Sequence, residues 1–401
     1  MASIRNIAVL LCLAVAPSLA QAQLRTLSPG ILTQNFDAAV SLEDLAVPPV
    51  ALTPAPVFRA GDFTGIPEFA FAYLNDLNVK LIDAAAESVD VVIFSITLKD
   101  NPEALLRAAG RGVKVRLILD EAHVYAKPDP QVTRLLQAPG VEVRTLRGTR
   151  AYGVNHNKIL VCDRAAAAVG SYNWTFGATF SNHENTLVAR QPAHVSGYVD
   201  YFEWMWAKAR TPAQGPSPEL PEGYYGLPPQ DPAPALSLNG VPVPAYLFSP
   251  GSRSEERLAG LIDAARTSVD AVTFTFSSKT LADALLRAKQ RGVKVRFLTD
   301  KNMGRTAYLA KFVFDNGVPM RWGIGRNGKG ALHNKFLILD GRVLQTGSFN
   351  WTVNASKNSF ENMIFTGDPA AVKAYQGTYD WLYNGAAPPT AAEFQIEPAA
   401  E

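Results

Sequence analysis

The chain has 401 residues, of which 47% are hydrophobic and 18% are charged. This composition is typical of a globular protein and excludes a disordered, collagen-like or coiled-coil chain. The 38 Lys and Arg residues nearly balance the 36 Asp and Glu residues, so the net charge is only +2. A protein that neutralises many phosphates is usually strongly basic, so we expect anion binding here to be local.

Residues 1–22 predict a secretory signal peptide. Arg5 precedes an apolar run from Ile7 to Ala16, and Ala20-Gln21-Ala22 forms a small-x-small cleavage site. The apolar run is shorter than the ~20 residues of a membrane-spanning helix, so no transmembrane anchor is expected in the mature chain. The sequence therefore predicts a secreted or periplasmic protein. Cleavage would leave one cysteine, Cys162, which cannot form an internal disulfide bond.

An internal repeat organises the rest of the chain. Residues 81–85 (Leu-Ile-Asp-Ala-Ala) recur at 261–265, and residues 111–116 (Arg-Gly-Val-Lys-Val-Arg) recur at 291–296, both at an offset of 180. Further on, residues 156–206 align without a gap on residues 333–383, at an offset of 177. The chain therefore contains two copies of one unit.

Each copy predicts the same order of elements. A helix that ends near Ser88 or Ser268 precedes a strand, a second helix, a glycine and another strand. In chain order the strands are expected at 89–97, 113–119, 269–276 and 293–298, with helices at 104–109 and 282–288. This order implies a mixed or parallel sheet covered by helices.

Prolines separate the two copies and indicate an extended linker without regular elements. The expected organisation is a signal peptide at 1–22, an irregular segment at 23–65, a first domain at 66–210, a linker at 211–245, a second domain at 246–386 and a tail at 387–401.

Both copies carry one set of polar residues at one spacing. The sets are His156, Lys158, Asp163, Gly170, Ser171, Asn173 and Glu184, and His333, Lys335, Asp340, Gly347, Ser348, Asn350 and Glu361. His and Lys are two residues apart, as are Ser and Asn, so on strands each pair would share one face. The ammonium, hydroxyl and amide suit the oxygens of a phosphate, and the imidazole stays free to attack phosphorus or transfer a proton.

The other histidines act as an internal control. In the alignment of the two copies, His123, His183 and His194 are matched by Met303, Phe360 and Ala371. His156 and His333 are matched by each other. Packing alone gives no reason to retain only this pair, so a shared function is favoured.

The pattern H-x-K-x4-D-x6-G-S-x-N, present twice, resembles the phospholipase D superfamily. Residues 170–175 with Glu184-Asn185, repeated at 347–352 with Glu361-Asn362, are most similar to its bacterial endonuclease and mitochondrial branch. The resemblance covers roughly residues 66–206 and 246–385. It implies an α/β fold of two pseudo-twofold-related α/β/α sandwich domains, with mixed sheets packed face to face and both motifs in one cleft.

The resemblance also implies a mechanism. One histidine, by family analogy His156, forms a covalent phosphohistidine, while the other protonates the leaving oxygen and then activates water. One imidazole must then start neutral and the other protonated, which predicts activity near the ordinary histidine pKa of ~6.5.

Roles follow residue by residue from this resemblance. The two glutamates would each hold an imidazole by its other nitrogen, and a solvated carboxylate is the alternative. Catalysis is assigned to His156, His333, Lys158, Lys335, Asn173, Asn350, Glu184 and Glu361, substrate binding to Ser171 and Ser348, and structural roles to Asp163, Asp340, Gly170 and Gly347.

No cofactor or metal is expected, because Lys158 and Lys335 occupy the place where a catalytic cation would sit. Two arginine-rich segments allow two interpretations: a local funnel for an anionic substrate, or ordinary solvated loops. They contain Arg144, Arg147 and Arg150, and Arg321, Arg326 and Lys329.

Aromatic residues are expected to pack rather than bind. Trp174 and Trp351 could line the cleft but are more simply core residues. Two helical faces recur, formed by Tyr198, Phe202 and Trp206 and by Tyr375, Tyr379 and Tyr383.

The sequence thus predicts an exported, metal-independent phosphodiesterase, a monomer with an internal pseudo-dimer. Phospholipid head groups are the favoured substrate, and an endonuclease that cleaves DNA or RNA with the same site is the alternative. A phosphatidyltransferase and an inactive phosphate-binding module are disfavoured.

Overall fold

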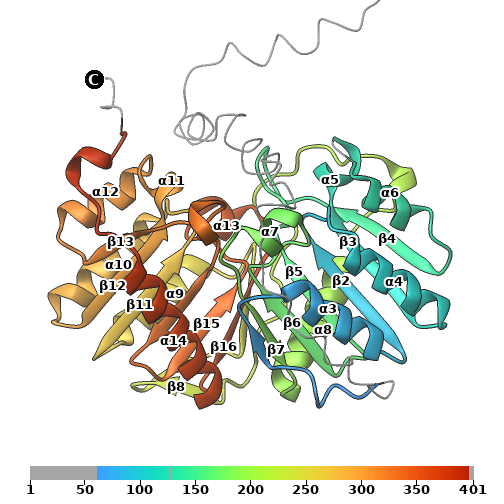
Figure 1. Cartoon of the computed structure of the whole chain (residues 1–401), viewed down its shortest axis with the longest axis horizontal. Helices are drawn as coiled ribbons and strands as arrows, with labels where there is room; N and C mark the ends of the chain where they lie inside the picture. The colour runs from blue at the N-terminus through green and yellow to red at the C-terminus, as the bar shows by residue number, and fades with distance from the viewer. Residues whose placement is uncertain (1–60, 127, 397–401) are drawn as a thin grey trace, which may run out of the picture. The chain divides into compact units, whose positions relative to one another are not determined.

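The structure, a computed structural model, describes residues 61–126 and 128–396. The predicted signal peptide and most of the segment 23–65 lie outside these residues. Two mixed seven-stranded sheets form the protein, with strand orders β1-β7-β6-β5-β2-β3-β4 and β10-β16-β15-β14-β11-β12-β13. The second order repeats the first, strand for strand, with helices packed on both sheets (Figure 1). The predicted α/β fold of two repeated halves is confirmed.

The first half runs from β1 to α8. Its strands are β1 (Phe69–Ala70), β2 (Ser88–Ile93), β3 (Lys114–Asp120), β4 (Val141–Leu146), β5 (Lys158–Cys162), β6 (Ala166–Gly170) and β7 (Thr186–Ala189). Its helices are α3 (Leu74–Ala84), α4 (Asp100–Gly110), α5 (Glu121–Tyr125), α6 (Pro130–Leu136), α7 (Phe176–Phe180) and α8 (Pro192–Trp206).

The second half runs from β10 to α14. Its strands are β10 (Tyr246–Ser249), β11 (Ser268–Thr273), β12 (Lys294–Asp300), β13 (Met320–Gly323), β14 (Phe336–Leu339), β15 (Val343–Gly347) and β16 (Glu361–Thr366). Its helices are α9 (Ser254–Ala264), α10 (Lys279–Gln290), α11 (Lys301–Gly304), α12 (Tyr308–Asp315), α13 (Val353–Lys357) and α14 (Pro369–Gly385), with a short 3₁₀ turn, η4 (Arg326–Gly328).

Three cores follow from the periodicity of these elements. The apolar faces of α3, α4 and α6 pack on one side of the first sheet, and those of α9, α10 and α12 pack likewise on the second. The third core joins the halves, because it combines residues of both sheets, such as Val161 and Ile338, with the aromatic faces of α8 and α14. Tyr198, Tyr375 and Tyr379 are fully buried there, as packed helical faces should be.

The linker contains a hairpin that sequence analysis missed. Leu236–Leu238 (β8) and Val241–Val243 (β9) pair antiparallel, and Asn239 and Gly240 turn between them with φ of 51° and 93°. Asn-Gly is a preferred two-residue hairpin turn, and a proline is tolerated in a sheet that has only edge strands. The proline count was therefore a poor guide to this segment.

Candidate active site

The motif residues lie at the ends of strands rather than within them. Of His156, Lys158, Ser171 and Asn173, which were expected on strands, only Lys158 belongs to one, so the predicted strand positions of the other three are wrong. The reason is that the loop before β5 leaves its own sheet and pairs with the other half: the His156 amide donates to the Phe360 carbonyl at 3.0 Å. The His333 amide donates to the His183 carbonyl at 3.0 Å in the same way.

Each imidazole is held by a glutamate of the opposite half. His156 Nδ1 lies 2.9 Å from the Glu361 carboxylate, and His333 Nδ1 lies 2.8 Å from the Glu184 carboxylate. Both glutamates are buried, so the solvated alternative does not describe them. Because Nδ1 is engaged in both rings, Nε2 is the nitrogen left for chemistry.

The serines support the glutamates. Ser171 Oγ donates to Glu184 at 2.5 Å and accepts from the Asn185 amide at 3.0 Å; Ser348 Oγ donates to Glu361 at 2.5 Å and accepts from the Asn362 amide at 3.1 Å. Both serines are fully buried. The predicted substrate-binding role therefore needs correction, since these hydroxyls are used inside the protein to fix the carboxylates.

The charges of both glutamates affect the pKa of each lysine, and the charge of Lys335 also affects that of Lys158. Lys158 Nζ donates to the His156 carbonyl, and Lys335 Nζ donates to the His333 carbonyl. Burial lowers the pKa of each lysine to about 7, against the opposing attraction of Glu361 and Glu184, and the charge of Lys335 lowers the pKa of Lys158 further. Because both glutamates act on each lysine and Lys335 acts on Lys158, both ammonium groups belong to one site.

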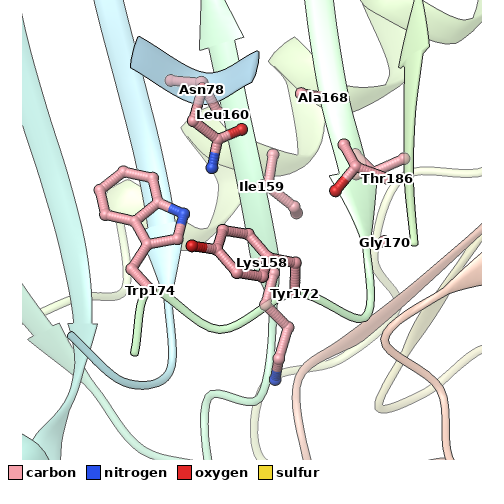
Figure 2. A pocket seen from close by; sticks show the side chains of 10 residues that line it. Asn78, Lys158, Ile159, Leu160, Ala168, Gly170, Tyr172, Trp174 and Thr186 are labelled. Atoms are coloured by element: carbon pink, nitrogen blue, oxygen red, sulfur yellow. The ribbon is translucent and has the colours of Figure 1, made fainter. Parts of the chain in front are cut away.

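Figure 2 shows the direction of the Lys158 side chain. Its ammonium points away from Asn78 and from the apolar side chains that line a void behind it. That void, about 10 Å³, is large enough for a single water and too small for a substrate. The aliphatic part of the lysine is thus packed in the first half, and only the charged end faces the site.

Burial also lowers the pKa values of the two histidines. It lowers the pKa of His156, and it lowers the pKa of His333 to about 4, while the paired glutamates oppose both shifts. Both rings are therefore neutral in the free protein near pH 7. A bound phosphodiester would bring negative charge to the site and raise these pKa values, which is what a general acid requires.

The asparagines remain available to a ligand. Neither Asn173 nor Asn350 makes a side-chain hydrogen bond within the described residues, and Oδ1 of each is buried without a partner. Both side chains are only partly covered. The Nδ2 groups are the donors of these amides, and because they make no hydrogen bond within the described residues they can donate to the oxygens of a ligand.

The aspartates and glycines of the motifs shape the turns. Asp163 accepts hydrogen bonds from the amides of Ala86, Glu87 and Ser88, and Asp340 accepts from three equivalent amides, 266–268. Burial would raise the pKa of Asp340, but these donors hold it at about 2. A Cβ on Gly170 or Gly347 would lie 2.0 or 2.2 Å from the carbonyl of Asn185 or Asn362, so neither position accepts a side chain.

Sequence analysis missed two aspartates that position the histidine loops. Asp120 ends β3 and accepts from the Asn155 amide at 2.8 Å; Asp300 ends β12 and accepts from the Leu332 amide at 2.9 Å. Burial raises their pKa values to about 7 and about 6. The two residues lie at the repeat offset of 180, and this was the signal that could have found them.

It also missed a set of amides that joins the halves beneath the site. Asn362 Nδ2 donates to Asn157 Oδ1 at 2.9 Å, and Asn334 Nδ2 donates to Asn185 Oδ1 at 3.0 Å. The middle residue of each His-x-Lys motif is thus tied to the residue after the opposite glutamate.

Most of the predicted arginine funnel is structural. Arg144 donates to the Trp206 carbonyl and Arg321 to the Tyr383 carbonyl, near the ends of α8 and α14, while Arg147 bonds linker carbonyls. Arg150 and Lys329 are exposed, and Arg326 is partly buried. Trp174 and Trp351 are buried in the cores, so the cleft-lining alternative is wrong.

Within residues 61–126 and 128–396, no cluster of three or more His, Cys, Asp or Glu side chains could hold a metal ion. No helix of the described chain has the length and apolarity needed to cross a bilayer.

Comparison with known families decides the membership of the chain. Residues 79–206 and 258–383, more than half of the sequence, match the family described as "Cardiolipin synthase, PLD-like domain". The chain belongs to this phospholipase D-like family. The predicted superfamily is thereby confirmed, and both halves carry the family domain.

Relatives and neighbours agree with this assignment. The mitochondrial cardiolipin hydrolase of Xenopus tropicalis is 38% identical over 128 residues (32% of this chain, 60% of the relative), and that of Homo sapiens is 36% identical over 136 residues (33% and 52%). The chain thus spans between half and two thirds of these relatives. Phosphatidylserine synthase of Haemophilus influenzae shares the fold, with a TM-score of 0.59 and 13% identity over 80% of this chain and 87% of that one.

These relatives overturn one prediction. A secreted or periplasmic location was expected, but the relatives that match are named as mitochondrial enzymes. The predicted location is therefore wrong.

Proposed function

We propose that the protein is a phosphodiesterase of the phospholipase D type that hydrolyses the head-group phosphodiester of a phospholipid. One observation carries the proposal: the reciprocal His156–Glu361 and His333–Glu184 pairs join two imidazoles, two ammonium groups and two free amides at the seam between the halves. In-line displacement at phosphorus needs a nucleophile and an acid on opposite sides, and this arrangement supplies both.

The chemistry proceeds in two displacements. Nε2 of His156 attacks phosphorus, a P–N bond forms, and the P–O bond to the leaving group breaks as His333 gives its proton to the departing oxygen. Water then attacks phosphorus, His333 accepts its proton, and the P–N bond breaks to release a phosphate monoester. Lys158, Lys335, Asn173 and Asn350 stabilise the charge on the non-bridging oxygens throughout.

The substrate class rests on the relatives, whose names state cardiolipin hydrolysis, and on the nearly neutral charge of the chain. A nuclease would use the same residues, and the resemblance of residues 170–175 to the endonuclease branch keeps that candidate open.

The test is hydrolysis of cardiolipin in vesicles, assayed beside plasmid and single-stranded DNA, for the wild type and the variants His156→Asn and His333→Asn. We expect lipid hydrolysis in the wild type and loss in both variants. Full activity in either variant would refute the shared site, and cleavage of nucleic acid without lipid hydrolysis would favour the nuclease. Denaturation of the wild type at alkaline pH during turnover should trap the phosphatidyl group on His156, because the P–N bond of a phosphohistidine is stable in base and hydrolyses in acid.

A further inference from the structure

At the boundary between the two halves, the place beside α14 and the equivalent place beside α8 are not equally filled by protein. A cavity of about 510 Å³ opens beside α14, between Phe71, Arg326 and Trp381. His183 and Trp381 form an edge-on ring pair at 5.4 Å in its wall, and Trp381 is 65% exposed. Cavities of this size commonly bind small molecules.

The pseudo-equivalent place beside α8 is occupied by protein. There Phe360 and Trp204 are the residues that correspond in the repeat to His183 and Trp381. The linker residue Tyr225 packs against Phe360, with ring centroids 4.7 Å apart. Tyr201, at the position of Thr378, lies against Trp204. Two phenol rings thus fill on one side the space that is open on the other.

On the open side, a buried polar atom lacks a hydrogen-bond partner among the described residues. On the filled side, Asn157 uses both amide atoms, and one of its contacts is with the Tyr201 hydroxyl at 3.4 Å. On the open side, Asn334 lines the cavity and is 1% exposed, yet its Oδ1 has no partner in the described chain. An occupant with an N–H or O–H donor would satisfy this oxygen, as hydrogen bonding of buried polar atoms requires.

A cation completes the cavity. Arg326 donates to the Phe71 carbonyl at 2.7 Å and more weakly to the Thr179 carbonyl, and it forms no ion pair within the described residues. The carboxylate that influences it, Glu184, also lines the cavity, but it is already bonded to His333 and Ser171. The guanidinium therefore has capacity for an anion.

We propose that this cavity, whose wall includes the Glu184 carboxylate that holds His333, binds a nucleotide base together with its phosphate beside the hydrolytic site and not at the reacting phosphodiester. The base stacks on Trp381 and His183, a ring N–H or amino group donates to Asn334, and Arg326 pairs with the phosphate. A lipid chain offers neither the donor nor the anion. The inference goes beyond the proposed function and does not depend on it.

Calorimetric titration of the full protein with adenosine 5′-monophosphate (AMP), adenosine and inorganic phosphate tests the proposal. AMP should bind more tightly than adenosine or phosphate alone. Thr378→Tyr copies the residue of the filled side and should weaken AMP binding at least tenfold, as should Trp381→Ala. Arg326→Gln should weaken AMP binding about tenfold and leave adenosine binding unchanged, because only the phosphate contact is lost.

Trp204→Ala, at the equivalent position of the filled side, is the matched control and should bind AMP like the wild type. His156→Asn should also bind AMP unchanged, which separates this site from the hydrolytic one. Displacement of AMP by a single-stranded pentanucleotide would show that the base can come from a strand, and absence of displacement would point to a free nucleotide. No binding of AMP at millimolar concentration, or equal binding by Trp381→Ala, would overturn the proposal even if Thr378→Tyr failed to fold.

Discussion

His156 in the first half and Glu361 in the second are joined by a hydrogen bond of 2.9 Å, although 205 positions separate them in the chain. His333 and Glu184 form the equivalent pair of the repeat at 2.8 Å. The orientation of each imidazole is therefore set by the opposite half, so the two halves can complete the site only together.

Replacing either glutamate should impair the chemical step. Glu361→Gln and Glu184→Gln remove the carboxylate that fixes the tautomer and stabilises the imidazolium, and we expect kcat to fall by about 10³- to 10⁴-fold with little change in KM. Steady-state kinetics on a phosphodiester substrate measure this, with the exposed Glu87→Gln as control. A change in KM alone would show that the glutamates bind substrate instead.

The serines give a contrasting outcome. Ser171→Ala removes a donor from the buried Glu184 carboxylate, whose pKa is lowered by His333 and by this serine in spite of its burial. We expect the free energy of unfolding to fall by about 1–3 kcal/mol and kcat to fall moderately, with KM unchanged. Denaturant unfolding and kinetics of the same variant test both statements, and a tenfold rise in KM would restore a substrate contact for Ser171.

The pH profile should be shifted to the acidic side of neutrality. Burial lowers the histidine pKa values, so the nucleophile stays neutral below pH 6.5, whereas Lys158 and Lys335 lose their charge as pH rises through about 7. We therefore expect kcat/KM to fall above pH 7. Lys335→Arg keeps a positive charge above pH 7, so the activity of this variant should fall at a higher pH than that of the wild type. A profile that stays flat to pH 9 would contradict the assignment.

Asp340 should stabilise the fold in a pH-dependent way. Its pKa is about 2 in the folded protein and 3.8 for the unperturbed group, so its contribution is present above pH 3.8 and is lost as pH falls towards 2. At pH 7 we expect Asp340→Asn to lower the free energy of unfolding by about 1 kcal/mol, a modest value because the group is partly exposed. The difference from the wild type should shrink between pH 4 and 2, as acid-dependent unfolding curves would show; the exposed Asp315→Asn is the control.

Hydrolysis should continue in EDTA. The lysine ammonium groups and the asparagine amides of the site supply the charge stabilisation that a cation provides in other phosphodiesterases. Dialysis against EDTA followed by the vesicle assay measures this. Loss of activity in EDTA, with recovery when a divalent metal is added, would contradict the proposed mechanism.

The repeat made much of the fold predictable. Because Lys114–Asp120 and Lys294–Asp300 share a pattern, one interpretation of strand and helix served both halves. What sequence could not supply was the pairing between halves: the spacing of Ser171 and Glu184 reveals nothing of His333, because the contact is made by folding. The linker was misjudged for a related reason, since its prolines outweighed the local Asn239-Gly240 turn.

Tyr225 occupies one of two pseudo-equivalent places, and nothing in the described chain occupies the other. In a homodimer of single-copy subunits the two equivalent places have the same sequence, so both are filled by protein or both are open. Fusion of two copies into one chain lifts that constraint. One flank can become rigid support for the shared chemistry while its counterpart is free to acquire a separate task.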